Sequence, residues 1–147
     1  MGPGKTLAVI CVLALLTAGA CNLLVPDYDV LDRFEVIKVV TDPQGNQHAV
    51  IVNYKHAETS RRVTAIWIET GEAPAVGSTE PRHGSPAAIW TGTPEALSVV
   101  WDNERLRVGV VPKSSKVSRD LQLCLADWLP ESADLCVRPD ATAIMIE

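Results

Sequence analysis

Short stretches in which apolar and polar residues alternate dominate the chain from Phe34 to its C-terminus. This period of two is typical of β-strands that bury one face, and the stretches are rich in β-branched residues. Asp42-Pro43-Gln44-Gly45-Asn46 and Asp102-Asn103-Glu104 have the composition of tight turns and predict hairpins. The predicted strands span residues 34–40, 48–55, 63–70, 87–91, 97–101, 105–111 and 141–146.

The segment 118–129 fits two kinds of secondary structure. Leu121, Leu123 and Leu125 alternate as in a strand, but the segment also carries an apolar stripe at helical spacing, with Ser118 available as a cap. We slightly favour the helix. The sequence therefore predicts a mainly β fold, a small antiparallel β-sandwich or curled sheet of about seven strands, with one short helix within 118–129.

The N-terminus has three parts. A short cationic start ends at Lys5, an uncharged apolar run follows over residues 6–17, and small residues precede Cys21. This is the layout of a secretory signal peptide.

The residues around the end of this run, Thr17-Ala18-Gly19-Ala20-Cys21, resemble a bacterial lipobox, although Ala18 stands where that motif usually has Leu. The resemblance implies that Cys21 is lipidated and becomes the first residue after cleavage. Two alternatives stay open: ordinary cleavage after Ala20 into a soluble exported protein, or an uncleaved membrane anchor that continues through Val25.

The expected organisation is a signal peptide over 1–20, a lipidated Cys with a short tether over 21–33, and a single β-rich domain over 34–147. The lipid on Cys21 makes a membrane the first expected partner. Because Asn22 and not Asp follows Cys21, the resemblance implies the outer membrane, facing the periplasm, in a bacterium with two membranes. In a bacterium with one membrane it implies the outer face of the cytoplasmic membrane.

The four cysteines divide evenly under this organisation. Cys11 leaves with the signal peptide and Cys21 takes the lipid, which leaves Cys124 and Cys136 as a pair in an oxidising compartment. We therefore predict a disulfide between them, which closes a loop of about a dozen residues and stabilises the fold by roughly 2–3 kcal/mol. No His or further Cys lies nearby in sequence to complete a metal site with this pair.

Charge argues against nucleic acid or anionic lipid as the partner. Loss of Lys5 with the signal peptide leaves 12 Lys and Arg residues against 18 Asp and Glu residues, so the mature chain is acidic. The pair Arg61-Arg62 could clamp a carboxylate or phosphate, although such pairs are also typical of an exposed turn.

Motifs for catalysis do not emerge from the sequence. It contains no Gly-x-Ser-x-Gly, no His-Glu-x-x-His and no Gly-rich phosphate loop. His48 and His56 would lie ~27 Å apart on an extended strand, too far to share a metal ion, and we expect both to be solvated. We predict no catalytic residue, no metal and no cofactor, and whether the chain is an enzyme stays open, with a non-enzyme favoured.

Tryptophan contributes most of the large aromatic surface. Trp67, Trp90 and Trp101 fall in predicted strands, where such side chains usually build the core. Trp128 is expected to be partly exposed.

The long segment 70–86 has three Gly, three Pro and no periodic apolar pattern. Connections of this length in a compact domain are usually either functional or disordered. Glu72, Glu80, Arg82 and His83 make it a candidate recognition loop, with disorder as the alternative.

Asp42-Pro43-Gln44-Gly45-Asn46, followed by Ala49-Val50-Ile51, weakly resembles small uncharacterised bacterial proteins with a Ser-Pro-Asp-Gly-Lys-type hairpin. That resemblance implies a fold and no activity. We expect a membrane-anchored envelope lipoprotein that acts as a non-enzymatic protein-contact module. The alternatives are a small hydrolase or ligand-binding lipoprotein, with a site built around Arg82 and His83, and an inhibitor of an extracellular hydrolase.

Overall fold

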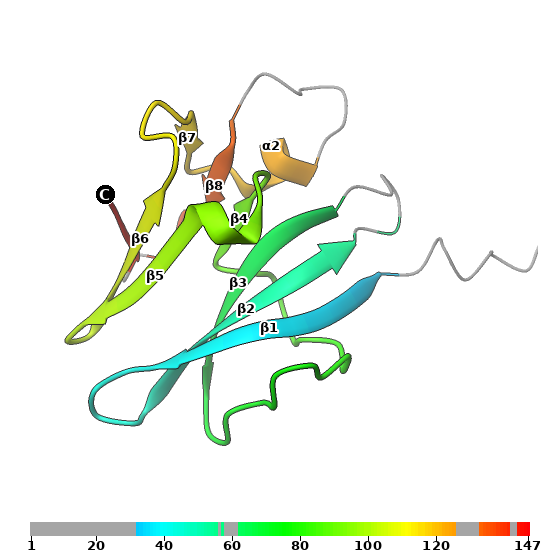
Figure 1. The fold of residues 1–147 in the computed structure, drawn as a ribbon, viewed down its shortest axis with the longest axis vertical. Helices are drawn as coiled ribbons and strands as arrows, with labels where there is room; N and C mark the ends of the chain where they lie inside the picture. The colour runs from blue at the N-terminus through cyan, green and yellow to red at the C-terminus, as the bar shows by residue number, and fades with distance from the viewer. Residues whose placement is uncertain (1–31, 56, 58–61, 126–132, 142–143) are drawn as a thin grey trace, which may run out of the picture. The chain divides into compact units, whose positions relative to one another are not determined.

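The computed structural model describes residues 32–55, 57, 62–125, 133–141 and 144–147. These residues form two sheets, one short α-helix and one 3₁₀ turn (Figure 1). The six-stranded sheet has the order β1-β2-β3-β4-β8-β7, and the three-stranded sheet has the order β5-β6-β9. The strands are β1 (Arg33–Thr41), β2 (Gln47–Lys55), β3 (Arg62–Thr70), β4 (Ala88–Trp90), β5 (Leu97–Asp102), β6 (Arg105–Val110), β7 (Val117–Ser118), β8 (Leu135–Val137) and β9 (Ile144–Ile146). The helical elements are α2 (Leu121–Leu125) and the 3₁₀ turn η2 (Pro94–Ala96).

The mainly β fold predicted from the alternation is confirmed, and antiparallel pairing prevails in it. Two pairings differ from the antiparallel expectation: β6 pairs with β9, and β7 with β8, in parallel. Both involve strands of two or three residues near the C-terminus that return to the sheets through longer connections. Such returns place a strand parallel to its neighbour, which adjacent hairpins cannot do.

Strand β2 is buried on both of its faces, which divides the core into two parts. Ala49 and Ile51 belong to an inter-sheet core, which also holds Val99 of β5 and Leu106 of β6. On the opposite face, Val50, Val52 and Tyr54 belong to a second, aromatic-rich core that Cys124 of α2 also joins. A strand covered on both sides is expected in a layered domain, and here β5, β6 and β9 supply one cover and α2 part of the other.

The three tryptophans that were predicted to build the core do so. Trp67, Trp90 and Trp101 are all buried. Trp67 meets Phe34 and Tyr54 edge to face within the aromatic-rich core. Trp101 on β5 links the two sheets, because its indole Nε1 donates a 2.7 Å hydrogen bond to the backbone oxygen of Val40 on β1. Trp128 lies outside the described residues.

The predicted β1–β2 hairpin is confirmed, and its turn is fixed by Asp42. The carboxylate of Asp42 accepts hydrogen bonds from the backbone N–H groups of Asn46 and Gln47, and its own N–H donates to the Gln47 oxygen. Gly45 has φ +76°, a conformation that costs glycine little. The β5–β6 hairpin also forms where predicted, with Asp102 opposite Arg105.

The C-terminal third departs most from the sequence prediction. Strands β7 and β8 were not predicted. Of the predicted strand 141–146, β9 covers Ile144–Ile146, Ala141 lies outside it, and residues 142–143 are not among the described residues. The predicted helix within 118–129 is present as α2, but its first turn is capped by Asp120, whose Oδ1 accepts from the Gln122 N–H. Ser118 belongs to β7 instead, and its hydroxyl accepts from the Asp120 N–H.

Candidate functional site

The long segment between β3 and β4, residues 71–87, follows a defined path along the sheet (Figure 1). It runs beside the edge strand β1, where the Val36 N–H donates to the Ser78 oxygen and the Gly77 N–H donates to the Val36 oxygen. It then returns to β3, where the Trp67 indole donates to the Gly84 oxygen. We call this segment the β3–β4 loop.

These contacts also cover part of the free edge of β1, which is the first strand of the six-stranded sheet. The Val36 groups bonded to Ser78 and Gly77 lie on the side of β1 away from β2. A bulge between Val36 and Lys38 further interrupts the strand. Covered groups, a bulge and a lysine are the devices by which edge strands avoid pairing with other chains. We therefore do not place a strand-addition site on β1.

Arg82, one of the four predicted recognition residues, anchors the β3–β4 loop to the sheet. Its guanidinium Nη1 lies 3.2 Å from Oε2 of Glu69 on β3, and Nε and Nη2 both donate to the Glu80 oxygen. Its side chain is only 8 % exposed, against 25 % for Glu69. Arg82 therefore faces inward and positions the loop.

The other predicted recognition residues face outward. Glu72, Glu80 and His83 are all exposed, and Val76, between them, is 66 % exposed. The loop thus has an inner side that is hydrogen-bonded to the sheet and an outer side that carries two carboxylates, an imidazole and a valine. Val76 was not singled out from the sequence, because one valine in an irregular segment carries no periodic signal.

His48 is buried, which makes the expectation of a solvated side chain wrong. Its Nε2 lies 2.8 Å from the Gly71 oxygen, and its Nδ1 lies 2.9 Å from Thr41 Oγ1. A carbonyl oxygen only accepts, so Nε2 carries the proton and Nδ1 accepts from the Thr41 hydroxyl in the neutral ring. His48 thus ties the start of the β3–β4 loop to the β1–β2 hairpin. His56 lies outside the described residues.

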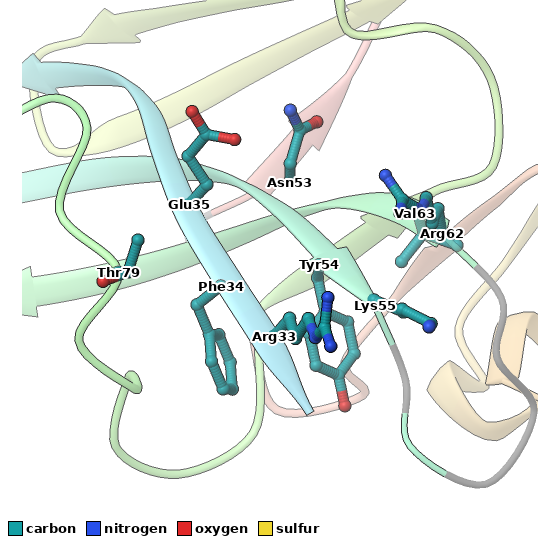
Figure 2. Close-up of a pocket in the computed structure, with 9 residues that line it drawn as sticks. All are labelled: Arg33, Phe34, Glu35, Asn53, Tyr54, Lys55, Arg62, Val63 and Thr79. Atoms are coloured by element: carbon teal, nitrogen blue, oxygen red, sulfur yellow. The ribbon is translucent and has the colours of Figure 1, made fainter. Parts of the chain in front are cut away.

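A hollow of about 360 Å³ lies at the end of the sheet where β1 and β3 begin and β2 ends. Its charged lining includes Arg33, Lys55 and Arg62, which oppose one another in the strand register. Figure 2 shows these three side chains at neighbouring strand ends. The sequence prediction had pointed only to the pair Arg61-Arg62, of which Arg61 lies outside the described residues.

The rest of this hollow is of mixed character. Figure 2 shows Glu35 and Asn53 on one side of the strands, and Phe34 and Tyr54 on the other. Thr79 contributes from the β3–β4 loop. The hollow therefore opens at the edge of the sheet and not over a single face.

The predicted disulfide between Cys124 and Cys136 is present, with the sulfur atoms 2.08 Å apart. It joins α2 to β8, and both residues are fully buried. Within the described ranges, no group of three or more metal-ligating residues is placed to hold an ion. The same ranges contain no helix with the length and apolar composition needed to cross a bilayer. Cys21, the predicted lipidation site, lies outside them.

No family model, curated protein or solved structure matches this chain. Its function has to be argued from its own residues.

Proposed function

We propose that this chain is an exported lipoprotein of the bacterial envelope that works by contacting a partner protein and does not catalyse a reaction. Its lipid would be carried by Cys21, in the outer membrane facing the periplasm or, in a bacterium with one membrane, on the outer face of the cytoplasmic membrane. The signal-like N-terminus supports export, and the Cys124–Cys136 disulfide is typical of a chain that folds in an oxidising compartment.

The observation that carries the contact role is the two-sided β3–β4 loop. Hydrogen bonds from His48 and Trp67 and the ion pair between Arg82 and Glu69 hold its inner side to the sheet. A loop held in advance loses little conformational entropy when a partner binds to it. Loops positioned by a rigid scaffold are also the usual place for binding residues.

The outward side chains indicate what kind of surface would fit. Glu72 and Glu80 are exposed on either side of the exposed Val76. A complementary partner surface would have basic side chains around a small apolar depression, because matched charges favour encounter and fix the orientation of docking.

The enzyme alternative gains no support from the geometry. It needs Arg82 and His83 at one site, but the Arg82 guanidinium contacts Glu69 and Glu80 on the inner side of the loop while His83 is exposed. The inhibitor alternative would use the same outward surface, with a hydrolase as the partner.

Photo-crosslinking in living cells tests the proposal. A photoreactive amino acid would replace Val76 in one strain and Val100 in another. Val100 is a matched control because it is a valine that is 54 % exposed on β5, away from the loop. We expect one discrete protein adduct from position 76 and none from position 100. Equal adduct patterns from both positions, or no protein adduct from either, would contradict a contact role for the loop.

A further inference from the structure

A second hollow, of about 400 Å³, lies between β1 and the start of β5. Its volume is near the small end of the range of about 300–1,000 Å³ that is usual for ligand sites. Its apolar walls come from three strands and continue the inter-sheet core; they are Ile37, Ile51, Leu97 and Val99. In Figure 1 the start of β5 stands further from β1 than its other end, where Trp101 bonds to Val40. We call this space the β1–β5 hollow.

One edge of β5 is unpaired beside this hollow. Val99 stands opposite Val108 on β6, and the Val108 oxygen accepts from the Glu147 N–H, on the β9 side of β6. Val99 and Val108 are therefore an antiparallel pair without hydrogen bonds between them, because successive residues of a strand direct their backbone groups to alternate edges. The N–H and C=O of Val99 consequently point to the free edge of β5, where Val99 lines the hollow.

These two backbone groups lack a partner within the described part of the chain. No hydrogen bond joins them to another described residue, although Val99 is only 5 % exposed. An unpaired N–H and C=O that are largely screened from water cost free energy. A ligand that offers both a donor and an acceptor at this edge would remove that cost.

Two charged side chains of opposite sign complete the lining. Lys38 stands opposite Ile51, so its side chain lies on the same face of the sheet as the inter-sheet core. Glu95 belongs to η2, just before β5. Both are exposed, and neither forms an ion pair or a hydrogen bond with another described residue. The hollow therefore combines apolar walls with one cation and one anion.

This combination selects among peptide-like ligands. A lysine on the inward face of an edge strand discourages a long strand from pairing there. An extended segment within a longer chain would also leave the ammonium of Lys38 and the carboxylate of Glu95 without partners. A short peptide with free ends supplies a carboxylate for Lys38 and an ammonium for Glu95. Its amide groups supply the acceptor and the donor that the backbone of Val99 lacks.

We propose that the β1–β5 hollow binds a short apolar peptide with free ends. A peptide of about two or three residues spans at most about 7–11 Å when extended, which suits a small site. Its side chains would contact Ile37, Ile51 and Leu97, and its two ends would be held by Lys38 and Glu95. This site is separate from the β3–β4 loop, and the inference does not depend on the lipid at the N-terminus.

The test uses the full chain as isolated from the producing bacterium, in detergent micelles, with the tripeptide Val-Val-Val as the probe. Amide NMR follows the titration, and empty micelles measure how much peptide the detergent takes up. We expect a saturable shift of the Val99 N–H and hydrogen exchange at least about fivefold slower at that group, because the bound peptide gives it a partner. The N–H of Ser98, whose neighbour across the hairpin is Gly109, points to β6 and should exchange at an unchanged rate.

Matched variants and blocked peptides test each charged end separately. Lys38→Met should weaken binding of Val-Val-Val about threefold to fivefold and leave binding of its C-terminal amide unchanged. Glu95→Gln should weaken binding of the free peptide to a similar extent and leave binding of the N-acetylated form unchanged. Lys113→Met, which removes an exposed lysine that does not line the hollow, should bind all forms as the unaltered protein does. Thermal melts check that each variant is folded.

Three results would overturn the inference. One is the absence of a saturable shift at Val99 with millimolar tripeptide. Another is equal affinity for the free peptide and for a peptide blocked at both ends, which would make this edge a strand-addition site for longer chains. The third is unweakened binding of the free peptide by both Lys38→Met and Glu95→Gln, which would refute recognition of the peptide ends.

Discussion

Replacement of Arg82 by Met should release the β3–β4 loop from the sheet while keeping the apolar stem of the side chain. The change removes the ion pair with Glu69 and the two hydrogen bonds to the Glu80 oxygen. Breaking a fully buried ion pair costs about 3–5 kcal/mol, and an exposed pair contributes roughly 0.2–1 kcal/mol. Because Arg82 is nearly buried and Glu69 is a quarter exposed, we expect Arg82→Met to lower the free energy of unfolding by about 2 kcal/mol.

Urea denaturation gives the global stability, and hydrogen exchange gives the local effect. The backbone N–H of Gly77, bonded to the Val36 oxygen, should exchange faster in Arg82→Met because the loop is no longer held against β1. A double-mutant cycle with Glu69→Gln should show coupling of about 1 kcal/mol between the two side chains. The exposed Arg105 serves as the control, since Arg105→Met should change stability by less than about 0.5 kcal/mol. Unchanged stability in Arg82→Met together with unchanged exchange at Gly77 would refute the reasoning.

Three further changes test other parts of the fold. Replacing Cys124 and Cys136 together by Ala should lower the free energy of unfolding by about 3 kcal/mol, because the disulfide no longer closes a loop across 12 positions in the unfolded chain. The thermal melt should stay cooperative, and loss of any transition would contradict a self-sufficient core. His48→Ala should cost about 2–3 kcal/mol in urea titrations, because it leaves a cavity and removes the partners of two polar groups, and a neutral result would refute the anchoring role. Gly92→Ala should cost about 1–3 kcal/mol, since its new methyl group would meet the buried indole of Trp90; a melting temperature equal to that of the unaltered protein would show that the ring can move aside.

The strands predicted from the sequence are those with their own periodic signal. In β5 and β6, Val99, Leu106 and Val108 face the core while their neighbours face solvent, and alternation makes this visible without tertiary information. Strand β8, in contrast, has three residues that are all buried. A strand covered on both faces loses its alternation, and three residues are too few to distinguish it from a loop.

The sequence identified the candidate recognition residues but not the side of the β3–β4 loop on which each of them lies. The composition of the β3–β4 loop marked it as unusual, but nothing local in the sequence distinguishes Arg82 on its inner side from His83 on its outer side. The partner of Arg82, Glu69, lies 13 residues earlier on β3. That Arg33, Lys55 and Arg62 lie at neighbouring strand ends likewise depends on the strand register, which cannot be read from the sequence until the strand pairing is known.

The most direct test of the central claim is the intact mass and N-terminal fragment spectrum of the protein isolated from bacterial membranes. The proposed lipoprotein should begin at Cys21, with residues 1–20 removed and lipid attached to that cysteine. Its Cys21→Ser variant should stay unprocessed and should no longer be found in the membrane fraction, because anchoring depends on several acyl chains together. A membrane-bound chain that still begins at Met1 and has an unmodified Cys21 would contradict the account and establish an uncleaved anchor instead.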